Sequence, residues 1–548
     1  KGSVTLEDFN HADLVIVIGQ NPGTNHPRML AALGETKKNG GKIITINPLP
    51  EVGLMSFKDP QNPLKWVGSG QQLTDDYLQV KINGDVALLK IILKLMKEKE
   101  DAEPNSVFDH QFIKEKTAGV DSLLKDLDNY SIDELLPQTG LSLEKIKETA
   151  ELIINNKKII ICWAMGLTQH KNAVDNIREV VNILLLKGSI GKKGAGTCPV
   201  RGHSNVQGDR TMGIWERPKP VFLDSLENEF SFKAPREHGY DVVEAIEAMH
   251  EKKAKVFFGM GGNFISATPD TNFTAEALQN CNLTVQVSTK LNRSHLITGK
   301  KALILPCLGR TEKDFQNENE QFVSVENSMG VVHQSKGTLN PCSNKLLSEP
   351  AIVAGIANAT LKNSLTNWSE LISDYDLIRN KIEATIPGFE NYNQRVRIKG
   401  GFYLPNNARV NDFSPTKTGK ANFSINKLPN WKLKDDELIM MTIRSHDQFN
   451  TTIYGLNDRY RGVFNERRII FMNRDDMKIR GLQEQQVVNL KSEFIGVTRK
   501  ANKFKVIGYD IPKNCCATYF PETNVLVPLD SFAHTAKTPA SKSVIITV

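Results

Sequence analysis

A glycine-rich segment at residues 188–210 carries the residues best suited to bind an anion. It contains two arginines, among them Arg201, with His203, Asn205 and Gln207 nearby. Such a sequence neither alternates like a strand nor packs like a regular helix, and its donors suit an anion or a polar ring. Arg201 follows Pro-Val and precedes Gly, so its guanidinium is predicted to present its fork of donors to an anion. The alternative is a mobile surface loop.

A second group of polar residues follows a predicted buried strand. The residues Leu-Val-Ile-Val-Ile at 14–18 form a continuous apolar run, which is typical of a strand buried on both faces. The turn at 19–27 is rich in Gly, Asn and Pro, and open α/β sheets bind ligands at this position. Small residues there let backbone N–H groups approach a phosphate. The alternative is a turn whose Gly and Asn serve only the chain geometry.

Two further polar clusters lie in the last part of the chain. Residues 442–448 and 450–452 follow a predicted strand, and arginines lie beyond them. Their polar density suggests the rim of a ligand site, and residues 518–524 and 537–539 form a similar pair of loops. Cys198 has no base beside it in the sequence, so we expect a buried structural thiol there.

Several standard sites are excluded by the sequence. No G-x-G pair continues to the third Gly of a dinucleotide fingerprint, no Gly-Lys pair completes a phosphate-binding loop, and H-E-x-x-H is absent. The Gly84-Asp85 and Gly208-Asp209 pairs lack the second Gly of a thiamine diphosphate signature. None of the seven cysteines stands in a C-x-x-C spacing, which disfavours a disulfide framework and a zinc or iron–sulfur site within these residues. We therefore expect a reducing compartment.

The elements that position these turns begin with a strand–helix–strand unit. The strand at 14–19 is followed by a helix at 28–38, closed by Asn-Gly-Gly, and by a strand at 42–47. This pattern predicts a parallel α/β sheet. Further elements of the same region are a helix at 144–155, a strand at 158–165 and a helix at 172–186.

A second copy of this unit is predicted from Lys255 onward. Its parts are a strand ending at Gly259, a Gly-Gly-Asn turn at 261–263, a helix at 275–280 and a strand at 283–288. The same number of residues separates Gly19 from Ile46 and Gly259 from Gln286. We expect Gly19 and Gly259 to lie at the carboxyl ends of parallel strands in two similar sheets related by approximate two-fold symmetry. The alternative is that any two such units share this spacing.

The length of the chain predicts three or four domains. We assign a first α/β nucleotide-binding domain to residues 1–200, a second to 201–359, a linker region with a helix at 368–383 to 360–430, and a β-barrel domain to 431–548. The barrel strands are expected at 438–443, 468–472, 486–490, 504–507 and 544–548, with a short helix at 474–480.

The composition is that of an ordinary globular protein. The 548 residues include 69 Lys plus Arg against 62 Asp plus Glu, a formal charge of +7, and 40% are hydrophobic. The positive excess is spread along the chain without a Lys/Arg run, so we expect a small anionic ligand and no nucleic acid. The longest apolar runs are far shorter than the roughly 18 residues of a membrane-spanning helix, so no membrane span is predicted.

Taken in order, several of these motifs resemble one protein family. They lie at 18–22 with His26-Pro27, 46–48, 163–169, 199–208, 442–445 and 522–524. The series is similar to the molybdopterin oxidoreductase family over essentially the whole chain. Within the family it resembles formate dehydrogenase alpha subunits, and it resembles their formate-dehydrogenase-like relatives more closely still. Formate-dehydrogenase-like relatives also carry the motifs Lys-Leu-Asn-Arg-Ser-His at 290–295 and Gly-Arg-Thr-Glu at 309–312.

The resemblance implies a cofactor of two molybdopterin guanine dinucleotides that hold one molybdenum. It also implies an α/β fold with two Rossmann-like nucleotide-binding domains and a C-terminal six-stranded, double-psi-like β-barrel. By motif match, the cofactor-binding residues are Gly19, Asn21, Pro22, His26, Asn47, Gly166, Gln169, Gly202, Gly262, Asn263, Gln286, Arg444, Ser445, His446, Thr452 and Asn524. Arg201 would stand next to the molybdenum, orient an anionic substrate and stabilise charge as a proton and two electrons leave. His203 is the second catalytic candidate.

The same resemblance implies an N-terminal part, with a 4Fe-4S cluster and the molybdenum ligand, that these 548 residues do not include, so the metal ligand stays unnamed. Asn47 stands where formate dehydrogenases have Asp, and His203 where they have Gln. The function expected is a cytoplasmic, molybdenum-dependent two-electron oxidation of formate or a similar small anion, with an unidentified electron acceptor. The non-enzymatic alternative is a degenerate relative that acts in binding or in acid or stress protection.

Overall fold

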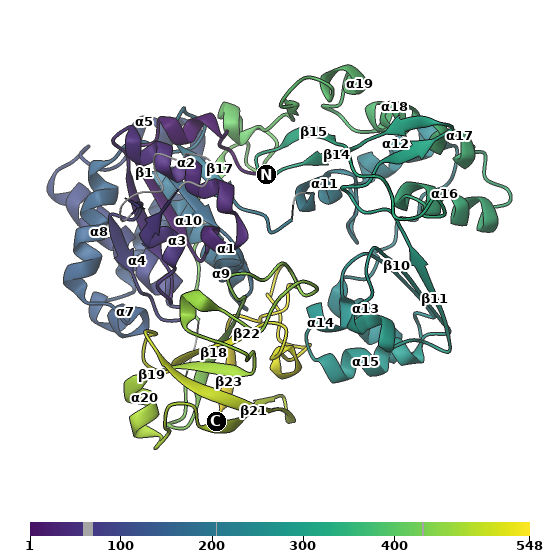
Figure 1. Ribbon diagram of the computed structural model, residues 1–548. Helices are drawn as coiled ribbons and strands as arrows, with labels where there is room; N and C mark the ends of the chain where they lie inside the picture. Colours follow the sequence, from purple (N-terminus) through teal and green to yellow (C-terminus); the bar gives the residue numbers. More distant parts are fainter. Residues whose placement is uncertain (59–69, 204, 430–431) are drawn as a thin grey trace. The chain divides into compact units, whose positions relative to one another are not determined.

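The computed structural model describes residues 1–58, 70–203, 205–429 and 432–548 (Figure 1). The chain divides into two compact units. The larger unit comprises residues 2–202 and 406–548, and the inserted unit comprises residue 1 and residues 203–405. Ser204 of the predicted anion-binding loop lies outside the described residues. The four-part domain division at residues 200, 359 and 430 stays a prediction.

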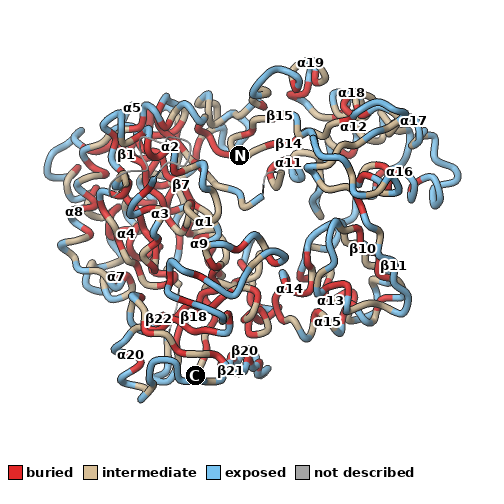
Figure 2. Tube along the Cα trace, viewed as in Figure 1, coloured by how far each residue is buried: buried red, intermediate tan, exposed pale blue. Residues whose placement is uncertain are grey.

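A five-stranded parallel sheet forms the centre of the larger unit. Its strand order is β5-β2-β1-β7-β8, and every neighbouring pair is parallel. The strands are β1 (Leu14–Ile18), β2 (Lys42–Ile46), β5 (Asp76–Leu78), β7 (Ile159–Trp163) and β8 (Gly196–Pro199). Every residue of β1 and β7 is buried, as expected for central strands with both faces covered (Figure 2).

Helices flank this sheet and pack apolar stripes against it. The long helix α4 (Asp85–Ala102) is buried along an unbroken run from Asp85 to Leu93, and its apolar side chains from Ala87 to Leu93 belong to the main core. Helix α8 (Leu143–Asn155) begins where the Ser142 side chain accepts from the Lys145 N–H. The other helices of this region are α1 (Pro22–Asn25), α2 (Pro27–Lys38), α3 (Val52–Met55), α5 (His110–Lys116), α6 (Val120–Asp128), α7 (Ile132–Thr139), α9 (Met165–Thr168) and α10 (Ala173–Leu186), with short strands β3 (Ser56–Phe57), β4 (Gln71–Gln72), β6 (Thr117–Ala118) and β17 (Ala421–Asn422).

A closed six-stranded β-barrel completes the larger unit, as the sequence predicts. Its order around the barrel is β18-β22-β19-β21-β20-β23. The elements are β18 (Leu438–Ile443), β19 (Ile469–Asn473), α20 (Arg474–Ile479), β20 (Val487–Phe494), β21 (Val497–Tyr509), β22 (Cys515–Tyr519) and β23 (Val544–Thr547). One apolar cluster fills the barrel, and Leu438, Ile470, Leu490 and Phe504 belong to it. Strand β22 was not among the predicted strands.

The inserted unit contains a three-stranded parallel sheet with the order β11-β10-β9. Its elements are β9 (Val256–Met260), β10 (Leu283–Ser288) and β11 (Lys301–Pro306), accompanied by α11 (Val206–Thr211), α12 (Pro220–Phe230), α13 (Val242–His250), α14 (Phe264–Ala267) and α15 (Thr271–Asn280). The two predicted strand–helix–strand units therefore exist, and they form separate sheets.

The rest of the inserted unit is antiparallel sheet and helix. Its elements are β12 (Asp314–Gln316), β13 (Asn319–Gln321), β14 (Val323–Glu326), β15 (Val331–Ser335), β16 (Phe402–Tyr403), α16 (Glu349–Thr360), α17 (Trp368–Ser373), α18 (Tyr375–Thr385) and α19 (Tyr392–Arg395). The helix predicted at 368–383 is two helices, because Asp374 leaves helical geometry and its side chain accepts from the Asp376 N–H to cap α18. Phe389, Tyr392 and Phe402 pack together beside α18.

The comparison of Gly19 with Gly259 requires a correction. Gly259 lies within β9, whereas Gly261 follows the strand, as Gly19 follows β1. Gly19 and Gly261 share a left-handed backbone, with φ of 61° and 70°. The N–H of Gly19 donates to the Ile46 carbonyl at 3.0 Å, and that of Gly261 donates to the Val287 carbonyl at 2.7 Å. The residue equivalent to Gly19 is therefore Gly261, and the equal spacing paired the wrong residues.

In the part of the chain that the structure describes, no helix combines the length and the apolarity needed to cross a membrane.

Candidate functional site

Two glycine turns meet at the carboxyl ends of β1 and β7. The N–H of Gly166 donates to the Gly19 carbonyl at 2.9 Å. A Cβ added to Gly166 would lie 2.4 Å from the Gly19 oxygen, and one added to Gly19 would lie 2.9 Å from the Gly166 carbonyl carbon. No side chain fits at either position. The contact therefore fixes both turns at the edge of the sheet where ligands of α/β proteins bind.

Asn47, directly after β2, holds the backbone of the first turn. Its Oδ1 accepts from the Gln20 N–H at 3.0 Å, and its Nδ2 donates to the Gln20 carbonyl at 2.8 Å. An ionised Asp in this place could accept the first bond but could not donate the second. The amide at position 47 thus fits a role in positioning the turn.

Asn21 joins the same turn to a buried carboxylate. Its Oδ1 accepts from the Thr24 N–H at 3.3 Å and so caps α1, while its Nδ2 donates to Glu51 Oε2 at 2.5 Å. Glu51 follows β2 and is 7% exposed.

Glu51 is the first member of a buried charge chain, which we define as Glu51, Arg461, Asp458 and His446. Arg461 donates through Nη2 to both Glu51 oxygens at 3.1 and 3.2 Å, and through Nη1 to Asp458 Oδ2 at 3.0 Å. His446 Nδ1 lies 2.8 Å from Asp458 Oδ1, and the Tyr519 hydroxyl donates to Asp458 at 2.8 Å. This buried charge chain runs from the edge of the parallel sheet into the barrel.

Burial dominates the electrostatics of this chain. It raises the pKa of Glu51 above the ordinary value, and the attraction of Arg461 does not offset the lost hydration. Burial acts in the same direction on Asp458, but His446 and Arg461 outweigh it, so the pKa of Asp458 is lowered. Burial lowers the pKa of Arg461, and the two carboxylates more than compensate, so the pKa is raised and the guanidinium stays charged.

Arg444 and Lys542 are two further positive groups beside the buried charge chain. Arg444 donates through Nη2 to the Gln448 carbonyl at 2.6 Å, and Lys542 donates through Nζ to the Thr442 carbonyl. Among the described residues, neither forms an ion pair with a carboxylate. Burial lowers the pKa of Arg444, and burial with repulsion from Arg444 lowers that of Lys542 to about 8. Cations with only neutral partners favour an incoming anion.

Glu51, Arg461, Arg444 and Lys542 line one cavity of about 140 Å³ in the larger unit, together with the two glycine turns. Of the predicted site residues, those that line it are Gly19, Asn21, His26, Asn47, Gly166, Gly202 and Arg444. Those that belong to the same unit but lie outside the lining are Pro22, Gln169, Arg201, Ser445, His446, Thr452 and Asn524. The cavity thus joins the ends of β1, β2 and β7 to the rim of the barrel.

Several residues outside the lining support it. Gln169 binds the segment before β23, because its carbonyl accepts from the Lys542 N–H at 3.1 Å and its Oε1 accepts from the Ser541 hydroxyl at 3.0 Å. The buried Ser445 hydroxyl accepts from Arg467 at 3.0 Å. Thr452 is exposed, whereas Pro22 and Asn524 are buried.

The predicted catalytic residues lie beyond β8. Arg201 is exposed, and its carbonyl oxygen lies 2.6 Å from His26 Nε2. Its neighbour Gly202 lines the cavity. His203 is exposed, belongs to the inserted unit and lies near Asp209. Their assignment to catalysis stays a prediction.

Three predicted residues gather in the inserted unit at the carboxyl ends of β9 and β10. Ser294 connects two of them, because its hydroxyl donates to Asn263 Oδ1 at 2.9 Å and its carbonyl accepts from Gln286 Nε2 at 2.9 Å. The Gly262 carbonyl accepts from Asn292 Nδ2 at 2.8 Å. This arrangement resembles the first turn but belongs to the other unit.

The sequence reasoning missed several residues that line the cavity: Glu51, Asn83, Asp85, His170 and Lys542. Arg461, which also lines it, is one of the arginines that the sequence places beyond the polar cluster at 442–452. Both amide atoms of Asn83 are buried without a hydrogen-bond partner. Burial raises the pKa of Asp85 to about 7 and lowers that of His170 to about 4. The Asn-Gly-Asp turn follows β5 and opens α4, so the signal that singled out the turn after β1 could have found Asn83 and Asp85.

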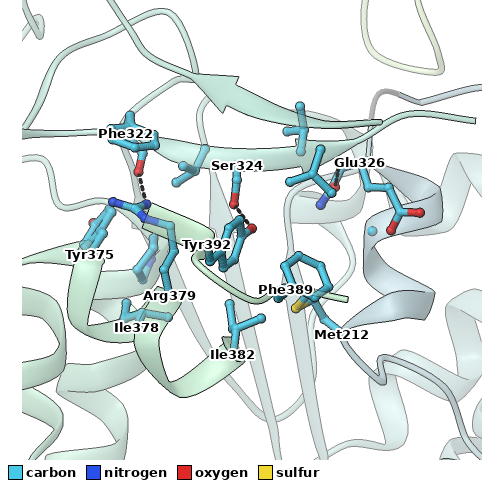
Figure 3. Close-up of a pocket in the computed structure, with 16 residues that line it drawn as sticks. Met212, Phe322, Ser324, Glu326, Tyr375, Ile378, Arg379, Ile382, Phe389 and Tyr392 are labelled. Carbon is cyan, nitrogen blue, oxygen red and sulfur yellow. Dashed lines mark hydrogen bonds between the residues drawn. The ribbon is translucent and has the colours of Figure 1, made fainter. Parts of the chain in front are cut away.

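A second cavity, of about 180 Å³, lies wholly within the inserted unit (Figure 3). Its wall is mainly apolar, and the polar groups in it pair with one another. Arg379 donates to the Phe322 carbonyl at 3.1 Å, and the Ser324 and Tyr392 hydroxyls lie 2.6 Å apart. Asn205 and Gly208 of the predicted anion-binding segment line it, but none of the residues assigned to the cofactor or to catalysis does.

Two regions of the chain match known protein families. Residues 2–326 match the family described as molybdopterin oxidoreductase, and residues 438–545 match the "Molydopterin dinucleotide binding domain". This chain belongs to the molybdopterin oxidoreductase family. The second match covers the barrel, from β18 to the start of the last strand.

Similar members of the molybdopterin oxidoreductase family include proteins of two bacteria. An uncharacterized oxidoreductase of Mycobacterium tuberculosis is 49% identical over 552 residues, which cover 100% of this chain and 71% of the relative. Protein YdeP of Escherichia coli (strain K12) is 44% identical over 562 residues, covering 99% of this chain and 73% of the relative. The F420-dependent formate dehydrogenase subunit alpha of Methanocaldococcus jannaschii is 28% identical over 407 residues, which cover 72% of this chain and 54% of the relative.

A solved structure supports the fold. Acetylene hydratase from Pelobacter acetylenicus superposes with a TM-score of 0.67 at 14% identity, covering 99% of this chain and 80% of that chain. At this identity the likeness concerns the fold alone.

The donors and acceptors in the cavity fit the polar cofactor of the family. Its lining contains buried polar atoms without a hydrogen-bond partner: Gln20 Oε1, Thr24 Oγ1, Asn25 Oδ1, both amide atoms of Asn83, His170 Nδ1, Arg444 Nε and Arg461 Nε. Buried polar atoms are normally paired, so such a concentration indicates a polar ligand. Within the described ranges, His, Cys, Asp and Glu nowhere form a group of three suited to a metal ion.

Proposed function

We propose that this cavity holds a molybdopterin guanine dinucleotide, and that the protein catalyses the molybdenum-dependent two-electron oxidation of formate or a similar small anion. The observation that carries the proposal is the cluster of unpartnered buried polar atoms at the strand ends. Membership of the molybdopterin oxidoreductase family and the match over the barrel support the cofactor class.

Asn83 and Asp85 are suited to bind the guanine base. Guanine presents two neighbouring N–H donors on one edge and an acceptor beside them. A carboxylate at position 85 could accept from both donors, and the unpartnered Asn83 amide offers a donor for the acceptor. Binding to these donors favours the ionised form of Asp85, against the burial that otherwise raises its pKa to about 7.

Arg444 and Lys542 are suited to the negative charge of the diphosphate. Both line the cavity, and among the described residues carbonyl groups are their only hydrogen-bond acceptors. A diphosphate would provide the counter-charge that burial otherwise denies them. The turn around Gly19 brings backbone close to the same space.

The proposed cofactor supplies a metal that takes up two electrons from the substrate. Arg201 would hold the anionic substrate through its planar fork of donors, with His203 as the second catalytic residue. Gly262, Asn263 and Gln286 would contribute to a second dinucleotide site. We extend the proposal to a 4Fe-4S cluster from a part of the protein outside these residues. The seven free cysteines support a cytoplasmic location.

The test uses the full-length protein purified from cells supplied with molybdate. Acid hydrolysis should release guanine nucleotide at about two per molybdenum if both sites bind the dinucleotide. Protein from tungstate-supplied cells should carry the nucleotide without the activity. Release of an adenine dinucleotide, or of no nucleotide, would refute the cofactor assignment and favour the degenerate, non-enzymatic relative.

A further inference from the structure

The cavity of about 180 Å³ in the inserted unit, which we call the inserted-unit cavity, is larger than an ordinary packing defect (Figure 3). Close-packed protein interiors contain few voids larger than one water molecule. An engineered apolar cavity of about 150 Å³ stays dry and takes up benzene or xenon. The inserted-unit cavity therefore has room for a small ring compound.

This cavity lies beside an apolar core cluster, below the surface of the inserted unit. Strand β14 and helix α18 supply much of its wall, and every lining residue is buried or half-buried. Phe389 and Tyr392 belong to the neighbouring apolar cluster, and Met212, Phe322 and Ile382 pack against that cluster. Ligand pockets of this enclosed kind surround most of the surface of a small molecule.

The two charged side chains among the described residues that line the cavity already have partners. Arg379 is 3% exposed and forms an ion pair with Asp376. Glu326, also 3% exposed, accepts from the Thr211 hydroxyl at 2.5 Å and forms an ion pair with Lys1 at 3.4 Å. A charged ligand would lose its hydration here without gaining a new counter-charge. The wall therefore favours a neutral ligand.

A pair of hydroxyl groups in the wall has one hydrogen to spare. Figure 3 shows the Ser324 hydroxyl of β14 directed toward the Tyr392 hydroxyl, and the two oxygens lie 2.6 Å apart. Each hydroxyl carries one hydrogen, so the bond between them uses only one of the two. Among the described residues, neither hydroxyl has another hydrogen-bond partner. Because Tyr392 is only 2% exposed and buried donors are normally paired, the spare hydrogen indicates an acceptor inside the cavity.

We propose that the inserted-unit cavity binds a small, neutral ring compound that carries one hydrogen-bond acceptor, such as an aromatic ketone. The ring would pack against the aromatic side chains of Phe322 and Phe389, which both line the cavity. The acceptor would take the spare hydrogen of the Ser324–Tyr392 pair. A water molecule suits this place less well, because buried waters typically make about three hydrogen bonds and the rest of the wall is mainly apolar. The inference does not depend on the cofactor or on the proposed oxidation.

Two probes of the same shape test the acceptor. Acetophenone and α-methylstyrene differ only in that the ketone oxygen of the first accepts a hydrogen bond, and ligand-observed NMR titration of the full-length protein measures the affinity of each. The double variant Ser324→Ala/Tyr392→Phe removes both hydroxyls. It should weaken acetophenone binding about five- to tenfold and leave α-methylstyrene binding within about twofold, which also reports that the variant keeps its fold. Equal changes for the two probes, or no change, would overturn the proposed ligand class.

A matched pair of larger side chains tests the location. Ile378 lines the cavity from α18, so Ile378→Phe should fill the space and abolish the binding of both probes. Ile356→Phe, at a position 37% exposed on α16 and outside the lining, should leave both affinities unchanged. Xenon introduced into crystals of the unsubstituted protein locates the cavity independently and should lie among the lining residues. Probe binding that survives Ile378→Phe, or a cavity that takes up neither probe nor xenon, would overturn the proposal.

Discussion

Arg461 and Glu51, 410 positions apart in the sequence, form an ion pair in which one guanidinium nitrogen reaches both carboxylate oxygens at 3.1 and 3.2 Å. Glu51 in turn accepts from Asn21 in the turn after β1, and Arg461 also donates to Asp458 in the barrel region. A single buried guanidinium thus ties the barrel to the turn that we propose as a cofactor site.

Arg461→Met tests this connection. Methionine keeps an unbranched apolar stem but leaves Glu51 and Asp458 buried without their cation. Loss of one partner of a buried pair costs about 3–5 kcal/mol, so the free energy of unfolding of the full-length protein should fall by that amount in urea titrations. Arg459→Met, at an exposed position two residues away, should change it by about 0.5 kcal/mol or less. Equal stability of the two variants would contradict the role of Arg461.

Asp85→Asn tests the proposed guanine contact through pH. A carboxyl whose folded pKa, here about 7, lies above its unfolded value favours the folded state at low pH, and that contribution is lost as pH rises through about 7. Cofactor-free wild-type protein should therefore lose stability as the pH rises from about 4 to about 7. The asparagine variant removes this loss, so at about pH 8 it should be more stable than wild type, by at most about 4 kcal/mol.

The same variant should retain less guanine nucleotide, because an amide cannot accept from both donors of the base. Thermal unfolding against pH and nucleotide content after acid hydrolysis measure the two effects separately. Asp101→Asn, at an exposed position on the same helix, is the control and should match wild type in both. A pH profile unchanged by Asp85→Asn would show that this carboxyl is not the titrating group, whatever the nucleotide content.

The sequence predicted those helices and strands whose structure is determined by the residues within the segment itself. Strand β1 was found because five apolar residues in a row, followed by a turn, are typical of a strand buried on both faces, and α2 because the Asn-Gly-Gly stop ends it. Strand β22 was missed because Cys-Cys-Ala-Thr-Tyr shows neither a strong apolar run nor alternation, and the barrel rather than the segment makes it a strand. The Gly259 pairing failed because sequence does not show which glycine of 259, 261 and 262 ends the strand.

The candidate site also contains residues that the local sequence indicates and residues that only tertiary packing brings together. Gly19 and Asn21 lie in the turn after β1, which the local pattern located, whereas Asn47 after β2 was assigned through its motif match to the family. Glu51 and Arg461 come together only through tertiary packing, and neither position carries a local signal for its partner. Asp85 had a local signal, because it lies in a polar turn between a strand and a helix. The sequence analysis considered it only as part of a thiamine diphosphate signature.

Gly166→Ala tests the close approach of the two turns. The added Cβ would lie 2.4 Å from the Gly19 oxygen, so the turns must separate. We expect a loss of about 1–3 kcal/mol of stability, as in other overpacked sites, together with reduced nucleotide content. Gly355→Ala in helix α16, where an added Cβ meets no atom within 4 Å, should be neutral or stabilising by up to about 1 kcal/mol. If both variants keep full nucleotide content and stability, the turns are not held by this contact.

Arg201→Lys tests the proposed substrate contact in the full-length protein. Arg201 is exposed beyond β8, and its neighbour Gly202 lines the cavity. Lysine keeps the positive charge but loses the planar fork that matches a carboxylate. We expect turnover of the small anion that the enzyme oxidises to fall about 100- to 1000-fold, as when one transition-state donor is lost. Molybdenum and guanine nucleotide content should not change.

Arg210→Lys, at an exposed position on helix α11, provides the comparison and should leave turnover within about twofold. Arg201→Ala extends the test through chemical rescue. Guanidinium added to this variant should fill the space left by the side chain and restore part of the lost turnover. An equal concentration of ammonium should not, because ammonium cannot reproduce the two-donor geometry. Normal turnover of Arg201→Lys would assign this arginine to structure or cofactor binding. Loss of molybdenum from Arg201→Lys would instead mean that Arg201 helps to retain the cofactor. Metal content and turnover must therefore be measured on one preparation, so that a role in substrate binding is separated from a role in holding the metal.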